Sequence, residues 1–71
     1  MVEYTDHAKL RMRQRRISEE EVQYCLEHYS VSYTDLKGNS IYRADLPTGR
    51  HIKVVVKAGS SSPAVVITVA D

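Results

Sequence analysis

The stretch SEEEVQYCLEHYSVSYTDL, residues 18–36, contains the change of hydrophobic period that decides the fold. Its first half predicts an amphipathic helix with one apolar stripe at helical spacing, formed by Val22, Cys25, Leu26 and Tyr29. Ser18 and Glu21 have the spacing of a capping box, so the helix is expected to begin just after Ser18. From residue 30 the apolar side chains alternate, which is typical of a β-strand.

Four strands are predicted downstream of this helix. The first spans residues 30–36, and a turn at 37–40 that contains Gly38 leads to a second strand at 40–46. A turn through Pro47 and Gly49 precedes a third strand at 50–58, and a serine-rich loop at 59–63 precedes a fourth at 64–70. Because the connections are short, the strands are expected to form an antiparallel meander.

A shorter helix is predicted upstream, from Thr5 as its N-cap to about residue 16. On a helical wheel one broad arc mixes basic with apolar side chains: His7, Ala8, Arg11, Met12 and Arg15. Leu10 falls on the opposite side. If the arc packs on the sheet, its histidine and arginines are expected at the rim of the packing surface, where a structural role for each is the alternative.

The predicted fold class is therefore α+β, with two N-terminal helices packed on one face of a four-stranded antiparallel sheet (ααββββ). The chain has 71 residues, 42% of them hydrophobic and 27% charged, which favours a single ordered domain over residues 1–71. Cys25 is the one cysteine, so no internal disulfide can form and a cytoplasmic location is expected. No signal peptide and no membrane span is expected.

The net charge of +1 conceals an uneven distribution. Residues 1–16 hold five bases and two acids (+3), residues 17–31 hold four glutamates (−4), and residues 32–71 hold five bases and three acids (+2). The acidic block is explained by the N-terminus of the second helix. What is left is a basic helix and a partly basic strand, which favour an anionic partner such as RNA.

Alternation along the third strand predicts one basic and one apolar face. His51 and Lys53 share a face with Val55, whereas Ile52 and Val54 point to the other side. The basic face is either an ordinary solvated surface or a surface that holds phosphate. Neighbouring strands supply Tyr42, Arg43 and Thr68 as further candidates. Tyrosine rings on such a face could stack on unpaired bases.

Several motifs together resemble a known bacterial family. The segment Thr5-x-His7-Ala8-x-x-Arg11-Met12-x-x-Arg15-x-Ile17-Ser18-x-x-x-Val22 is followed by Gly38-Asn39, by Gly49-Arg50 with Val54-Val55-Val56, and by Val66-Ile67-Thr68-Val69. This order resembles the family called domain of unknown function 4258. That family is in turn similar to compact ribonuclease toxins of the RelE, colicin-type and barnase-like kinds, which implies RNA bound across the sheet and a protein antitoxin as partner.

The resemblance carries over to His7, Arg11, Arg15 and Thr68 and, by position, to Lys53. Of these, His7, Arg11, Lys53 and Thr68 are predicted to be catalytic and Arg15 to bind substrate. The alternation of the strands adds Tyr42, Arg43 and His51 as predicted substrate-binding residues. Metal-independent RNA cleavage needs a base, a cation beside the phosphorane and an acid. His7 is expected as base or acid, Arg11 and Lys53 as the cations, and Thr68 as a hydrogen-bond donor to phosphate. His51 is a second proton-transfer candidate if its face is exposed.

Two alternatives stand beside the ribonuclease. A non-catalytic module would bind RNA, or a protein partner along a free strand edge, without cutting anything. A metal site is disfavoured, because Cys25-x-x-His28 lacks a second cysteine pair and Cys25 belongs to the apolar stripe. No cofactor is expected.

Overall fold

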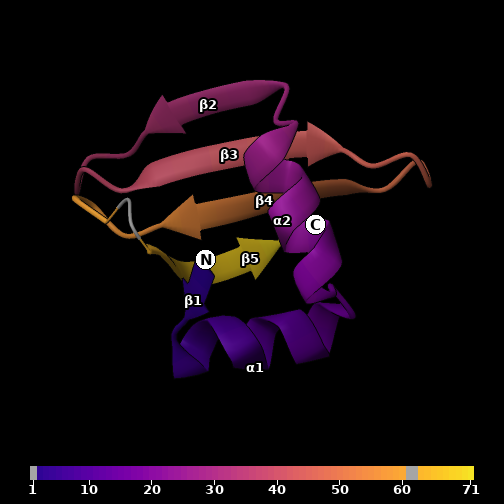
Figure 1. Ribbon diagram of the computed structural model, residues 1–71, viewed down its shortest axis with the longest axis horizontal. Helices are drawn as coiled ribbons and strands as arrows, with labels where there is room; N and C mark the ends of the chain where they lie inside the picture. The colour runs from indigo at the N-terminus through magenta and orange to yellow at the C-terminus, as the bar shows by residue number, and fades with distance from the viewer. Residues whose placement is uncertain (1, 61–62) are drawn as a thin grey trace.

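The protein is described here by a computed structural model that covers residues 2–60 and 63–71. Its elements in chain order are β1 (Val2–Tyr4), α1 (Asp6–Arg15), α2 (Glu19–Glu27), β2 (Val31–Thr34), β3 (Ser40–Asp45), β4 (His51–Val56) and β5 (Ala64–Ala70) (Figure 1). The two helices and the last four strands confirm the predicted order of elements. Two positions of the predicted loop at 59–63, residues 61 and 62, lie outside the described part of the chain.

The sheet is five-stranded and mixed, in the order β1-β5-β4-β3-β2. Strands β2 to β5 form the expected antiparallel meander. The prediction of only four strands, all antiparallel, was wrong, because β1 adds to the far edge and runs parallel to β5 with Val2 opposite Ala64 and Tyr4 opposite Val66. A three-residue strand is too short to show a period, and its partner lies 62 positions away along the chain.

Both helices begin at the capping signals that their sequences carry. The Thr5 hydroxyl accepts a hydrogen bond from the Ala8 amide at 3.1 Å and so caps α1. Ser18 and Glu21 form the complete capping box at the start of α2, with bonds of 3.1 and 2.9 Å. Between the helices Arg16 adopts a left-handed backbone conformation with φ of 55°, which ends α1.

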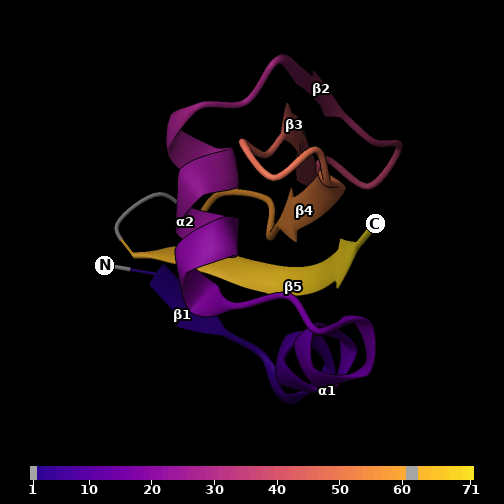
Figure 2. The same cartoon turned by 90° about the vertical axis from the view of Figure 1, so that its right-hand side faces the viewer.

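The two helices share one core with the sheet. In Figure 1 α2 crosses in front of β3 and β4, and in the turned view of Figure 2 it lies on one side of the sheet while α1 runs below β5. Ala8 and Met12 are the buried residues of α1 and Leu10 is 47% exposed, which confirms the predicted packing arc. The core cluster comprises Ala8, Met12, Ile17, Val22, Cys25, Ala44, Leu46, Ile52, Val54, Val56, Val66 and Val69.

Cys25 is a core residue, as its place on the apolar stripe predicts. Its side chain is fully buried, and its thiol donates to the Tyr42 carbonyl oxygen at 3.5 Å. Burial raises the pKa of the Cys25 thiol to about 11, so the group is held in its neutral, unreactive form. Neither helix in residues 2–60 and 63–71 is long and apolar enough to cross a membrane.

Candidate functional site

The side of the sheet away from α2 carries the polar groups. Because Ile52, Val54 and Val56 point into the core, the alternate residues of β4 emerge on the opposite side. Strand register then extends this surface, since Arg43 pairs with Lys53 and Asp45 pairs with His51. We call this surface the exposed face; its members are Val31, Tyr33, Ile41, Arg43, Asp45, His51, Lys53, Val55, Thr68 and Ala70. Ile41 and Val55 lie on this side of the sheet but are themselves buried, with 9% and 7% of their surface exposed.

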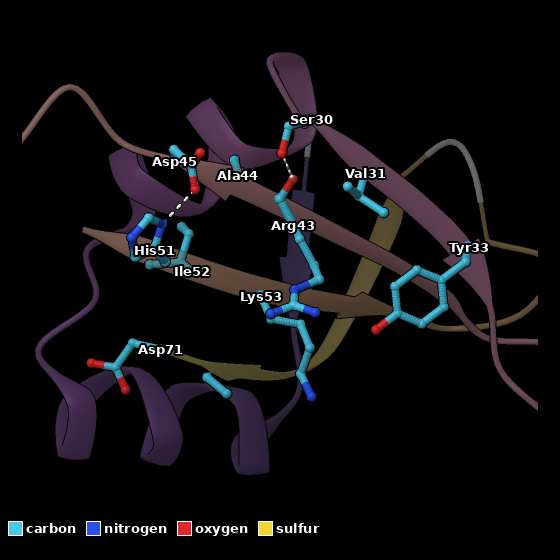
Figure 3. Close-up of a pocket in the computed structure, with 11 residues that line it drawn as sticks. Ser30, Val31, Tyr33, Arg43, Ala44, Asp45, His51, Ile52, Lys53 and Asp71 are labelled. Atoms are coloured by element: carbon cyan, nitrogen blue, oxygen red, sulfur yellow. Dashed lines mark hydrogen bonds and ion pairs between the residues drawn. The ribbon is translucent and has the colours of Figure 1, made fainter. Parts of the chain in front are cut away.

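A hollow of about 370 Å³, here called the polar hollow, lies on the exposed face where β3 ends and β4 begins. Arg43 and Lys53 approach each other across it, and the ring of Tyr33 stands at one side (Figure 3). Neither of these two cations forms an ion pair with another of the described residues. Two adjacent positive charges without a protein counter-ion are well placed to receive an anion.

His51 and Asp45 form the second polar feature of this hollow. The His51 Nδ1 atom lies 2.5 Å from the Asp45 Oδ1 atom, as the dashed line in Figure 3 marks. Both side chains are solvent-accessible, with exposed fractions of 77% and 71%. The contact occupies Nδ1 and leaves Nε2 of the imidazole for another partner.

A second hollow of about 480 Å³, here called the apolar hollow, continues along the exposed face toward the β2–β3 turn. Ile41, Val55 and Ile67 line its floor, and Thr68 and Lys53 border it. Lys53 is the residue that lines both hollows. The exposed face therefore offers a charged site and an adjoining apolar site with one shared cation.

The wall of the apolar hollow is a turn organised by Asp35. Its Oδ1 atom accepts hydrogen bonds from the amides of Lys37 and Asn39, each at 2.9 Å, and Gly38 supplies the left-handed conformation with φ of 85°. Burial opposes ionisation of Asp35, but the hydrogen bonds from Asn39 and Lys37 outweigh it and lower the pKa of the carboxyl group. The turn therefore holds a fixed shape beside the hollow.

Seven of the eight predicted site residues divide into two groups. Arg43, His51, Lys53 and Thr68 come together along the exposed face, in or between the two hollows. The α1 residues do not join them: His7 is exposed, Arg11 is half-buried, and neither of the two lines the polar hollow or the apolar hollow. Arg15 reaches the edge of the site through Asp71, at 4.0 Å from its carboxylate.

Tyr42 lies on the covered side of the sheet. Its neighbour Arg43 is on the exposed face, so alternation turns Tyr42 toward the helices, where its ring meets that of Tyr29 at 5.0 Å. The structure thus separates Tyr42 from the other candidates and places Tyr33, not Tyr42, beside the polar hollow. Alternation along residues 31–36 predicts that Val31 and Tyr33 share one face of their strand. The register of β2 with β3 shows that this face belongs to the exposed face.

Arg50, directly before β4, joins four parts of the chain. Its guanidinium donates to the carbonyl oxygens of Arg15 and Arg16 at the end of α1, to the Glu21 carboxylate of the capping box and to Asp71 after β5. The sequence shows Arg50 only as part of the Gly49-Arg50 motif and does not predict this role, because the partners of Arg50 are 21 to 35 positions away.

The pH dependence of stability should report the bond between Arg50 and Asp71. The hydrogen bond from Arg50 lowers the pKa of Asp71 below its ordinary value, against the effect of burial. A lowered folded-state pKa adds stability that is complete above the unfolded-state pKa and is lost as pH falls through the folded-state value. We therefore expect Asp71→Asn to be less stable than the wild type at neutral pH, with the difference vanishing in strong acid.

Urea unfolding of the two proteins across this acidic range measures the effect. Asp35 also has a lowered pKa, but it is present in both proteins and cancels in the comparison. A difference between the two proteins that stays constant with pH would contradict the assignment to Asp71.

Fold and site together define a small α+β domain whose sheet is covered by helices on one face and carries cations on the other. The chain belongs to the family described as domain of unknown function (DUF4258), whose model matches residues 4–71. This confirms the family resemblance. Comparison with curated proteins and with solved structures gave no match.

Proposed function

We propose that this domain binds single-stranded RNA across the exposed face and cleaves it without a metal ion, as a toxin-type endoribonuclease. The observation that carries the proposal is the pair Arg43 and Lys53, adjacent in register on neighbouring strands and without counter-ions among the described residues. A guanidinium fork and an ammonium group side by side suit the oxygens of one phosphodiester.

The surroundings of the two cations favour a single strand over a duplex. The apolar hollow beside Lys53 and the ring of Tyr33 offer surfaces for the faces of bases, which a duplex keeps stacked inside. A phosphate over Arg43 and Lys53 would let a base enter the apolar hollow, with the Thr68 hydroxyl at its border. The proposal includes a RelE- or barnase-like architecture and a neutralising protein partner.

A non-catalytic binding module is the second candidate, and one observation favours it. All four residues of β2 are exposed at the free edge of the sheet, including Val31 and Tyr33. Such an edge accepts an added strand from a protein partner. This candidate predicts that the domain binds RNA, or a protein partner along β2, and leaves RNA uncut.

RNA binding is tested with a fluorescent single-stranded oligonucleotide, by anisotropy at several salt concentrations and with EDTA present. We expect Arg43→Ala and Lys53→Ala each to weaken binding. Each variant should also reduce the slope of log affinity against log salt by about 0.7 for every phosphate that it no longer neutralises. Lys9→Ala, which removes an exposed lysine of α1 outside both hollows, is the matched control.

The same samples, run on denaturing gels, separate the candidates. Cleavage of the oligonucleotide by the wild type supports the endoribonuclease, and binding with no cleavage supports the module. The proposal is wrong if the wild type does not bind RNA at moderate salt, or if Lys9→Ala weakens binding as much as Lys53→Ala does.

A further inference from the structure

The His51–Asp45 pair lies in the polar hollow with the two phosphate-binding candidates, Arg43 and Lys53. We propose that His51, held by Asp45, is the base that removes the ribose 2′-hydroxyl proton during RNA cleavage. This inference rests on the proposed function. It gives the proton-transfer role to His51 on β4, which the sequence offered as the second candidate, in place of His7 in α1.

Strand register brings the base and the cations to one side of the sheet at a suitable spacing. His51 and Lys53 are two residues apart on β4, and Asp45 and Arg43 are opposite them on β3. Two residues along a strand span about 7 Å, with both side chains on the same face. A phosphodiester held by Arg43 and Lys53 has the ribose with the attacking 2′-hydroxyl beside His51 when the RNA strand runs from His51 toward Lys53.

Asp45 gives His51 the arrangement that a general base requires. The contact of 2.5 Å between Asp45 Oδ1 and His51 Nδ1 keeps the proton of the neutral ring on Nδ1. The Nε2 atom is then an acceptor, and the carboxylate stabilises the imidazolium that forms when Nε2 takes a proton. Asp45 is a positioning residue in this scheme, since it acts through His51.

The reaction step is a transesterification within the RNA. His51 Nε2 takes the 2′-hydroxyl proton while the 2′ oxygen forms a bond to the adjacent phosphorus, and the bond from phosphorus to the 5′ oxygen breaks. Arg43 and Lys53 offset the added negative charge of the phosphorane. The leaving 5′ oxygen takes a proton from water, and His51 returns its proton to solvent. The products are a 2′,3′-cyclic phosphate and a 5′-hydroxyl, with no net consumption of water.

The other two histidines of the chain are placed differently. His28 ends α2 and its ring lies 4.7 Å from that of Tyr24, beside Glu27. His7 is exposed in the first turn of α1. Neither lines the polar hollow, whereas His51 does.

The test compares cleavage with binding in matched histidine variants. We expect His51→Ala to lower the cleavage rate of single-stranded RNA by about 10²-fold or more. Binding of a fully 2′-O-methylated oligonucleotide, which lacks the 2′-hydroxyl proton, should be little changed. His28→Ala is the control and should cleave as the wild type does. Mass spectrometry of the wild-type products should show the cyclic phosphate.

Two further readouts distinguish a chemical role from a structural one. The cleavage rate of the wild type should fall at acidic pH, whereas the residual rate of His51→Ala should not. Added imidazole should restore part of the cleavage rate that His51→Ala has lost. Asp45→Ala should lower the rate without changing binding, and Asp45→Glu should recover part of it, because a carboxylate is again present beside the ring.

The inference is overturned if His51→Ala cleaves at the wild-type rate, or if His7→Ala abolishes cleavage while His51→Ala does not. It is also overturned if the wild type binds RNA and leaves it intact, a result that preserves RNA binding. If the wild type does not bind RNA, the proposed function itself fails. The four results therefore separate failure of the base assignment from failure of the proposed function.

Discussion

Replacing Arg50 with alanine is expected to lower the free energy of unfolding by about 2–4 kcal/mol. The Arg50 side chain is only 27% exposed, and its guanidinium satisfies two backbone carbonyls that end α1. Arg50→Ala removes the hydrogen bonds from this guanidinium to the two carbonyls and to the carboxylates of Glu21 and Asp71. These bonds lie where both helices meet β4 and the end of β5. Urea unfolding monitored by circular dichroism measures the loss.

Two variants make the assignment to Arg50 specific. Arg50→Lys keeps the positive charge but not the planar fork, so its stability should lie between those of the wild type and the alanine variant. Arg13→Ala removes an exposed arginine of α1 and should have little effect. Equal stability of Arg50→Ala and Arg13→Ala would show that the network contributes nothing.

Val54→Ala is expected to cost about 2–3 kcal/mol, which is a large part of the total for so small a domain. Val54 is completely buried at the centre of β4, where its side chain faces the helices. Removing two methyl groups leaves a cavity between the sheet and the helices that the β-branched neighbours cannot easily fill. The denaturant midpoint measures the cost.

The adjacent residue provides the matched control. Val55 has the same side chain on the opposite side of the sheet, where it lines the apolar hollow. Val55 is only 7% exposed, but the space that Val55→Ala vacates would join the apolar hollow instead of forming a closed cavity, so this variant should cost less. A larger loss for Val55→Ala than for Val54→Ala would mean that the exposed face is the better packed of the two.

Most of the fold was predictable because local signals agree with it. Thr5, Ser18 and Glu21 mark the helix starts, and the β5 boundaries Ala64–Ala70 match the apolar run. The strand β1 was not predictable, since three residues show no period and a parallel pairing leaves no turn motif. Pairing across the length of the chain is set by tertiary packing.

The candidate site was only partly predictable. Alternation along β4 correctly separated Lys53 from Val54, but which side the helices cover depends on packing. The neighbours of Lys53 depend on register across strands, which placed Arg43 beside it and turned Tyr42 away. The position of Asp45 beside His51 follows from the same register and has no signature in the sequence.

The pairing of β1 with β5 has a consequence for the order of folding. The meander from β2 to β5 joins neighbours in the chain, whereas β1 contacts residues 62 positions away, so its closure carries a greater entropic cost. We expect β1 to dock late, onto a meander that has already formed. The Thr5 amide, which donates to the Val66 carbonyl at 3.0 Å, should then exchange its hydrogen faster than amides at the centre of β4. The last strand of the sheet to dock is thus the first that the ribosome makes.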